Sequence, residues 1–182
     1  MRIQRYLPVA ACLLSACASA PKIDYYTVSM EPSGRARPTV DLKVERLQTT
    51  DALSRSQILI ATSPTTIDYY ATDLWAAGVG EVVQLKLQAE LGAPVDGRTT
   101  FLLSGTVLAF QQVDTPGGAD ALAQLEISVR DSSAKRYDPP VLSKTYEARL
   151  PAASASPAAV AAALSKCLEQ IAAEIATDLW SP

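Results

Sequence analysis

The C-terminal part of the 182-residue chain carries the pattern that most limits its fold. After Ser156, apolar residues recur three and four positions apart, which places them on one face of a helix. Ser156 can cap the first turn, and Pro157 suits the first helical position. A helix with one long apolar face must cover another layer, so the pattern predicts a helix packed on a sheet. The members of this stripe are Val160, Leu164, Cys167, Leu168, Ile171, Ile175 and Leu179.

Three segments ahead of this helix have the composition of strands. Residues 99–113 are apolar on both faces, as is typical of a central strand, and residues 121–131 alternate between apolar and polar. The Gly- and Asp-rich residues between them, 114–120, predict the turn of a long hairpin. Residues 141–150 then predict a third strand.

The first half of the chain has a related pattern. A strand is predicted where Val40, Leu42 and Val44 alternate with charged residues. Two short strands, Ile58–Ala61 and Thr66–Tyr70, follow as a second hairpin. A second helix is then predicted, capped by Thr72 or Asp73 and ended by Gly92, from a stripe at Trp75, Val79, Val83, Leu87 and Leu91.

Strands followed by a helix, twice over, predict the fold class. We expect an α/β protein with a mixed, largely antiparallel sheet covered by the two amphipathic helices. Residues 23–182 are enough for a single domain with one core.

The N-terminus has the layout of a secretory signal. Arg2 and Arg5 precede an apolar run that is too short to span a bilayer, which needs about 20 residues. The run ends in "LLSAC", which resembles the bacterial lipobox. We therefore expect residues 1–16 to be a signal peptide, Cys17 to be the lipidated first mature residue, and residues 17–22 to be a tether. The alternative is a plain signal peptide cleaved near Ala18 or Ala20.

Lipidation would determine the location of the protein. Several acyl chains on one cysteine attach a protein stably to a membrane, whereas a single acyl chain attaches it only marginally. Ala18 follows the cysteine, where an Asp would favour retention in the inner membrane. We expect an outer-membrane anchor with the domain facing the periplasm.

Composition excludes several classes of function. The two arginines of the signal leave with it, so the mature chain has a net charge of −5 and no basic stripe for nucleic acid. The chain has no histidine, which removes the commonest general base and metal ligand. Cys167 lies on an apolar helical face, where a buried hydrophobe is the simpler interpretation. We expect no enzyme activity, no metal and no cofactor.

Aromatic residues are the best candidates for a contact site. They gather in two short segments, and Tyr and Trp combine large apolar area with a polar group. The alternative is that they pack in the core or along its rim. The candidates for contact with a partner protein or a lipid cargo are Tyr25, Tyr26, Tyr69, Tyr70 and Trp75.

The whole mature chain resembles a known family. Its lipobox, the "YYTV" that follows, the hairpin "ILIATSPTTIDYYA" and the segment "DLWAAGVGEVVQLKLQAEL" are similar to the ABC-type transport auxiliary lipoproteins. That family includes the lipoprotein component of paraquat-inducible type systems. The resemblance implies an α/β fold and no catalytic residues.

The resemblance also implies partners. It suggests an accessory to an ABC permease and ATPase with an MCE-domain protein, in a system that moves lipids or other hydrophobic compounds. The other hypothesis is an envelope-assembly scaffold of the outer membrane that handles no cargo. The sequence leaves open whether the chain forms a homo-oligomer.

Overall fold

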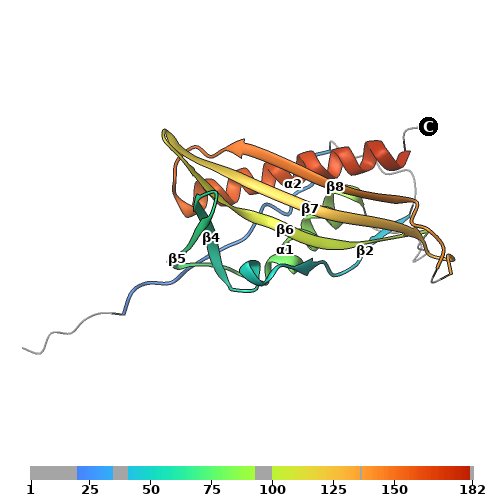
Figure 1. Ribbon diagram of the computed structural model, residues 1–182, viewed down its shortest axis with the longest axis horizontal. Helices are drawn as coiled ribbons and strands as arrows, with labels where there is room; N and C mark the ends of the chain where they lie inside the picture. The colour runs from blue at the N-terminus through green and yellow to red at the C-terminus, as the bar shows by residue number, and fades with distance from the viewer. Residues whose placement is uncertain (1–19, 35–40, 93–99, 136, 181–182) are drawn as a thin grey trace, which may run out of the picture.

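A long antiparallel hairpin forms the centre of the structure. The computed structural model describes residues 20–34, 41–92, 100–135 and 137–180 (Figure 1). Strand β6 (Phe101–Thr115) turns at Pro116 and Gly117 into strand β7 (Gly118–Asp131), and Thr115 pairs with Gly118. Strand β8 (Leu142–Pro151) pairs with β7 in antiparallel fashion. The three strands predicted from residues 99–150 are therefore confirmed.

The other edge of β6 is covered by three short strands in succession. Each of them runs parallel to β6. They are β2 (Leu42–Val44), β3 (Gln48–Thr49) and β4 (Gln57–Ser63), with a short 3₁₀ turn η1 (Asp51–Leu53) before the last.

The sheet continues beyond β4 to its outer edge. Strand β5 (Thr66–Trp75) pairs antiparallel with β4, and β1 (Asp24–Tyr26) lies parallel to β5 at the edge. The described residues thus form one eight-stranded sheet in the order β1-β5-β4-β6-β7-β8, with β2 and β3 also on β6. Its longest pairings are antiparallel.

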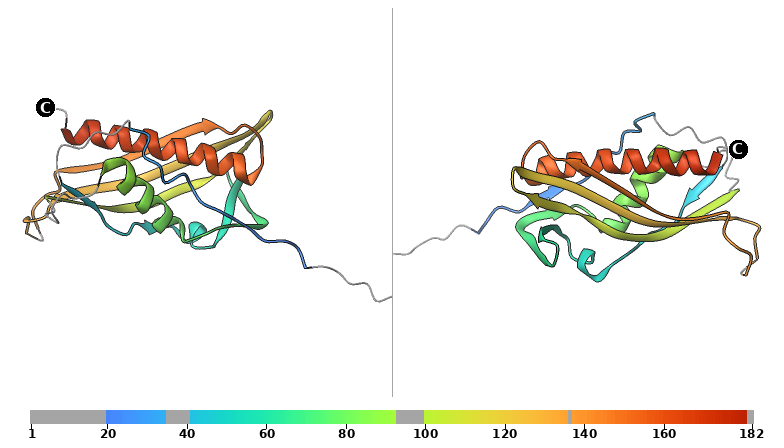
Figure 2. Two further views of the ribbon diagram at one scale, coloured as in Figure 1. Left: turned by 180° about the vertical axis from the view of Figure 1, so that it is seen from behind. Right: turned by 45° about the horizontal axis from the view of Figure 1, so that its top comes forward.

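Both helices lie on the same face of this sheet (Figure 2). Helix α2 (Pro157–Trp180) packs on β7 and β8, and helix α1 (Val79–Leu91) packs on β2, β6 and α2. The predicted α/β fold, a mixed sheet covered by two amphipathic helices, is confirmed. Within the described residues, neither helix is long and apolar enough to cross a membrane.

Helix α2 begins where the sequence predicts. The Ser156 hydroxyl accepts a hydrogen bond from the Ala159 N–H at 3.3 Å, and Pro157 is the first helical residue. The predicted stripe faces the core, because Val160, Leu164, Cys167, Leu168, Ile171 and Ile175 are all 0% exposed and Leu179 is partly buried.

Helix α1 begins later than the sequence predicts, and this is a correction. Thr72, Asp73 and Trp75 belong to β5, and the helix starts at Val79 after Gly78. The strand persists because Trp75 pairs with Tyr26 of β1 and its N–H donates to the Ser56 carbonyl at 2.7 Å. These long-range bonds cannot be read from local periodicity.

The backbone geometry favours glycine at two positions, Gly80 within α1 and Gly92 directly after it. A Cβ on Gly80 would lie 2.4 Å from the Leu47 carbonyl oxygen, so only glycine lets the helix approach this backbone so closely. Gly92 ends the helix with φ of 82°, a left-handed value that favours glycine. The predicted end of the helix at Gly92 is confirmed.

Candidate functional site

The two aromatic segments meet at one edge of the sheet. Tyr25 lies opposite Leu74 and Tyr26 opposite Trp75 in the parallel pairing of β1 with β5. Trp75 is 3% exposed and its ring centroid lies 5.1 Å from that of Phe110, so it packs in the core. Tyr25 is the most accessible of the five candidates at 66% exposed.

Tyr26 is half-buried on the opposite side of β1 from Tyr25. A hydrogen bond with Asp73 and, secondarily, burial raise the pKa of the Tyr26 phenol. This phenol therefore stays protonated at neutral pH and can serve as a hydrogen-bond donor.

Tyr69 and Tyr70 are adjacent on β5 and point to opposite faces of the sheet. The Tyr69 hydroxyl donates to the Ala52 carbonyl at 2.9 Å, and the Tyr70 hydroxyl donates to the Gln112 side-chain carbonyl at 2.6 Å. Both side chains are half-buried and both hydroxyls are bound internally. Both residues therefore also support the fold.

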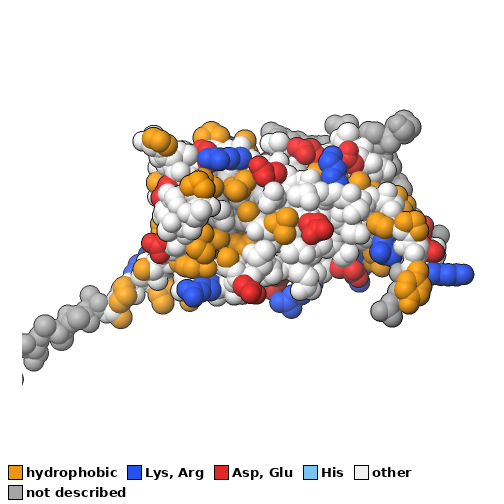
Figure 3. Space-filling model, viewed as in Figure 1, with side chains coloured by type: hydrophobic (Ala, Val, Ile, Leu, Met, Phe, Trp, Pro, Cys, Tyr) orange, Lys and Arg blue, Asp and Glu red, His pale blue; other side chains and the backbone are white. Residues whose placement is uncertain are grey.

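An apolar groove opens beside the β4–β5 hairpin on the face that the helices leave uncovered. It has a volume of about 460 Å³. Asp114 and Arg149 are its charged residues. Figure 3 shows hydrophobic side chains gathered on this face, over β4. The apolar residues of its lining are Ala61, Pro64, Ile67, Val113 and Leu122.

On the helical face, residues 27–34 cross both helices, and we call this segment the strap. The Ser29 N–H donates to the Ser165 hydroxyl of α2 at 3.0 Å. Ser33 donates to the Glu90 carboxylate of α1 from its N–H at 2.8 Å and from its hydroxyl at 2.6 Å. Val28 of the strap is 1% exposed. The strap is thus fixed to both helices.

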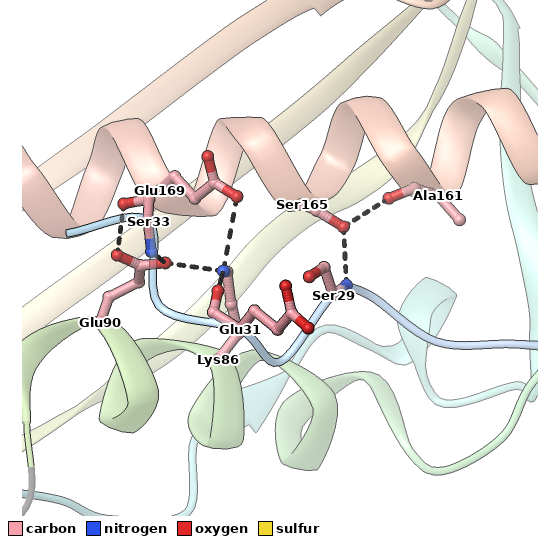
Figure 4. Close-up of polar contacts among 8 residues, drawn as sticks. All are labelled: Ser29, Glu31, Ser33, Lys86, Glu90, Ala161, Ser165 and Glu169. Carbon is pink, nitrogen blue, oxygen red and sulfur yellow. Dashed lines mark hydrogen bonds and ion pairs between the residues drawn. The ribbon is translucent and has the colours of Figure 1, made fainter. Parts of the chain in front are cut away.

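A buried cluster of charges lies beneath the strap (Figure 4). Lys86 is 0% exposed, and its Nζ lies 2.6 Å from the Glu90 carboxylate and 3.5 Å from that of Glu169. The same ammonium donates to the strap carbonyl of Glu31 at 2.8 Å. A buried charge is tolerated only when it is paired and hydrogen-bonded, and each contact here meets that need.

Sequence reasoning missed this cluster. Lys86 and Glu90 are four residues apart on a helix whose apolar stripe includes Leu87 and Leu91. The row formed by Val82, Lys86 and Glu90 lies beside that stripe, so the charges turn toward α2 instead of solvent. The signal in the sequence was a Lys and a Glu four residues apart, directly beside the apolar stripe of a helix.

The buried Glu90 carboxyl should make the stability of the protein depend on pH in the acid range. Burial alone would raise its pKa, but hydrogen bonds from Lys86 and Ser33 outweigh burial and lower the pKa. Its stabilising contribution is therefore present above the unfolded value of about 4.3 and is lost as the pH falls through the folded value. In urea unfolding, the stability difference between wild type and Glu90→Gln should be largest at neutral pH and shrink below about pH 4. A difference that is the same at every pH would contradict this role.

The described residues hold no grouping suited to catalysis with a metal. None of their His, Cys, Asp and Glu side chains form a cluster of three that could hold a metal ion. Burial raises the pKa of the Cys167 thiol to about 11, and its Sγ lies 3.6 Å from the Ala121 carbonyl. Cys167 is therefore a core residue and a poor nucleophile. The signal peptide and Cys17 lie outside the described residues.

The sheet carries both helices on one face and a groove of mainly apolar residues beside the β4–β5 hairpin on the other. The family of the ABC-type transport auxiliary lipoprotein component matches residues 26–176, so the chain belongs to this family. No curated protein matches the chain.

Solved structures share the fold. A protein from Xanthomonas campestris is 21% identical with a TM-score of 0.68, and the match covers 85% of this chain and 92% of that one. An uncharacterised protein is 16% identical with a TM-score of 0.68 over 87% of this chain and 99% of that one. At these identities the likeness concerns the fold alone.

Proposed function

We propose that this protein is the lipid-anchored, non-enzymatic docking component of an MCE-linked ABC transport system that moves lipids or other hydrophobic compounds across the envelope. The observation that carries the proposal is the family match over residues 26–176, joined to the lipobox that ends at Cys17. The chain lacks an ATP-binding motif, so a partner ATPase supplies the energy. Residues 1–16 are the signal and residues 17–22 the tether.

The anchor site is the outer membrane, with the domain in the periplasm. Ala18 after the lipidated cysteine supports this placement over the inner membrane. A tether of six residues, 17–22, keeps the domain near the bilayer. The protein is thereby positioned to meet an MCE-domain protein that approaches from the inner membrane.

We place the partner contact at the β4–β5 hairpin. Tyr69 and Tyr70 lie on this hairpin, and Ile67 beside them is 51% exposed and lines the apolar groove. Exposed apolar side chains around a groove are common at interaction sites. Trp75 and Tyr26 support the edge of the sheet next to it.

Complementation tests this function and its anchor. Deletion of the gene should weaken the outer-membrane barrier to the same extent as deletion of the MCE gene, and the double deletion should add nothing. The wild-type gene should restore the barrier, whereas Cys17→Ser should fail, because its product keeps its signal or leaves the membrane. Mass spectrometry of the native protein should show acyl chains on Cys17. Additive defects in the double deletion would favour the scaffold hypothesis. An unmodified N-terminus at Ala18 would show that the protein has no lipid anchor at Cys17.

A further inference from the structure

The short extended segment that leads from the tether into β1 has one apolar side. Ile23 is 51% exposed and Tyr25 is 66% exposed. In an extended chain, alternate residues share a side, so these two exposed side chains lie on the same side of the segment. Between them, Asp24 pairs with Lys22 at 2.6 Å, and on the other side of Tyr25, Tyr26 is half-buried.

The tether limits where this apolar side can lie. From Cys17 to Ile23 the chain has six steps, which span at most about 20 Å when fully extended. A cysteine whose acyl chains are in a bilayer therefore holds Ile23 and Tyr25 at, or close to, the membrane surface. Figures 1 and 2 show the chain leaving the body of the domain at this end in every view.

A second exposed aromatic residue lies at the opposite end of the sheet. Tyr137, which is 90% exposed, lies in the connection between β7 and β8. That connection follows Asp131, which pairs with the first residue of β6, whereas β4 pairs with Gln111–Val113 near the end of β6. Tyr25 pairs with Leu74 of β5, and Leu74 pairs with Gln57 of β4, so Tyr25 lies toward the end of β6 and Tyr137 lies beyond its start.

The chemistry of the exposed pair fits the boundary between lipid and water. A tyrosine places its ring among the lipid chains and its hydroxyl at the headgroups, and an isoleucine adds apolar area. The mature chain is acidic, so attraction to anionic lipid does not account for the contact.

From these observations, and resting on the proposed lipid anchor, we infer that Ile23 and Tyr25 form a second membrane contact. The occupant of this surface is the bilayer that holds the acyl chains of Cys17. The contact fixes the β1 edge of the domain against the membrane and holds the far end, with Tyr137, away from it. The anchor and this contact together therefore fix the orientation of the domain at the membrane, which a flexible tether alone would not do.

The test uses the acylated full-length protein in vesicles of phosphatidylethanolamine and phosphatidylglycerol. Single cysteines replace Ile23, Tyr25 or, as the matched control, Tyr137, and each carries a nitrobenzoxadiazole label. Cys167 is buried with a raised pKa, so the label reacts with the introduced thiol. Lipids with a spin label near the headgroup should quench positions 23 and 25 about twofold or more and leave position 137 unchanged.

Two further arms identify the source of the contact. About 0.5 M salt, or vesicles without phosphatidylglycerol, should leave the quenching intact, because the contact is apolar. Adding Tyr25→Ser to the label at position 23 should weaken the quenching there.

The experiment distinguishes failure of the second membrane contact from failure of the lipid anchor. Acylated, vesicle-bound protein with labels at 23 and 25 as unquenched as that at 137 would overturn this inference alone. Shielding of position 25 only after addition of the MCE protein would also overturn it, because the surface would then be a protein contact. A Cys17 without acyl chains would overturn the anchor and this inference with it.

Discussion

Lys86→Met should destabilise the protein by about 3 to 5 kcal/mol, the range for removing one partner of a buried ion pair. The substitution keeps the length of the side chain but leaves the Glu90 carboxylate, in a residue 3% exposed, without its counter-ion. It also removes the donor to the Glu31 carbonyl, so the strap loses one of its bonds to α1. Urea unfolding followed by circular dichroism at pH 7 measures the change.

A double variant separates charge from packing. Lys86→Met combined with Glu90→Leu removes the pair together, and such replacements are often neutral or stabilising. We expect the double variant to recover most of the stability that the single variant loses. If the double variant is as unstable as the single one, the volume and bonds of Lys86 matter, and the charge pairing does not.

Leu168→Ala and Ile171→Ala should each cost about 2 to 5 kcal/mol, as large-to-small changes in a core do. Both side chains are 0% exposed on the face of α2 that covers the sheet. Lys166→Ala on the exposed side of the same helix is the matched control, and it should stay within about 0.5 kcal/mol of wild type. Equal denaturation midpoints for all three variants would show that α2 is not packed as described.

Features of the fold that depend on local chemistry could be predicted from the sequence. Helix α2 has a Ser156 cap, a proline at its first position and a strong apolar stripe, and each signal lies within a few residues of the others. The β6–β7 hairpin is similarly local, since its turn and both alternating strands are contiguous. Agreement among such signals makes an element predictable.

Features that depend on distant contacts could not be predicted. The last residues of β5 have a helical pattern, but β1 holds them as strand from almost fifty positions away in the sequence. The charge cluster joins Lys86 to the strap and to Glu169, and three separate segments must be placed before it exists. The sequence offered five aromatic residues as candidates for contact, but it could not tell which of them are exposed. Tyr25 is exposed and Trp75 is buried because of their places in the sheet.

Co-purification tests the proposed docking role most directly. A tagged copy of the chain, expressed from its own locus, is isolated from detergent-solubilised envelopes of cells that also carry a tagged MCE subunit. We predict that the MCE subunit, the permease and the ATPase are recovered with the chain in fixed ratio. Cys17→Ser should lower that recovery, and Ile67→Asp at the hairpin groove should abolish it while leaving the unfolding midpoint unchanged. Recovery of the MCE subunit with its permease and ATPase but without this chain would contradict the proposed function.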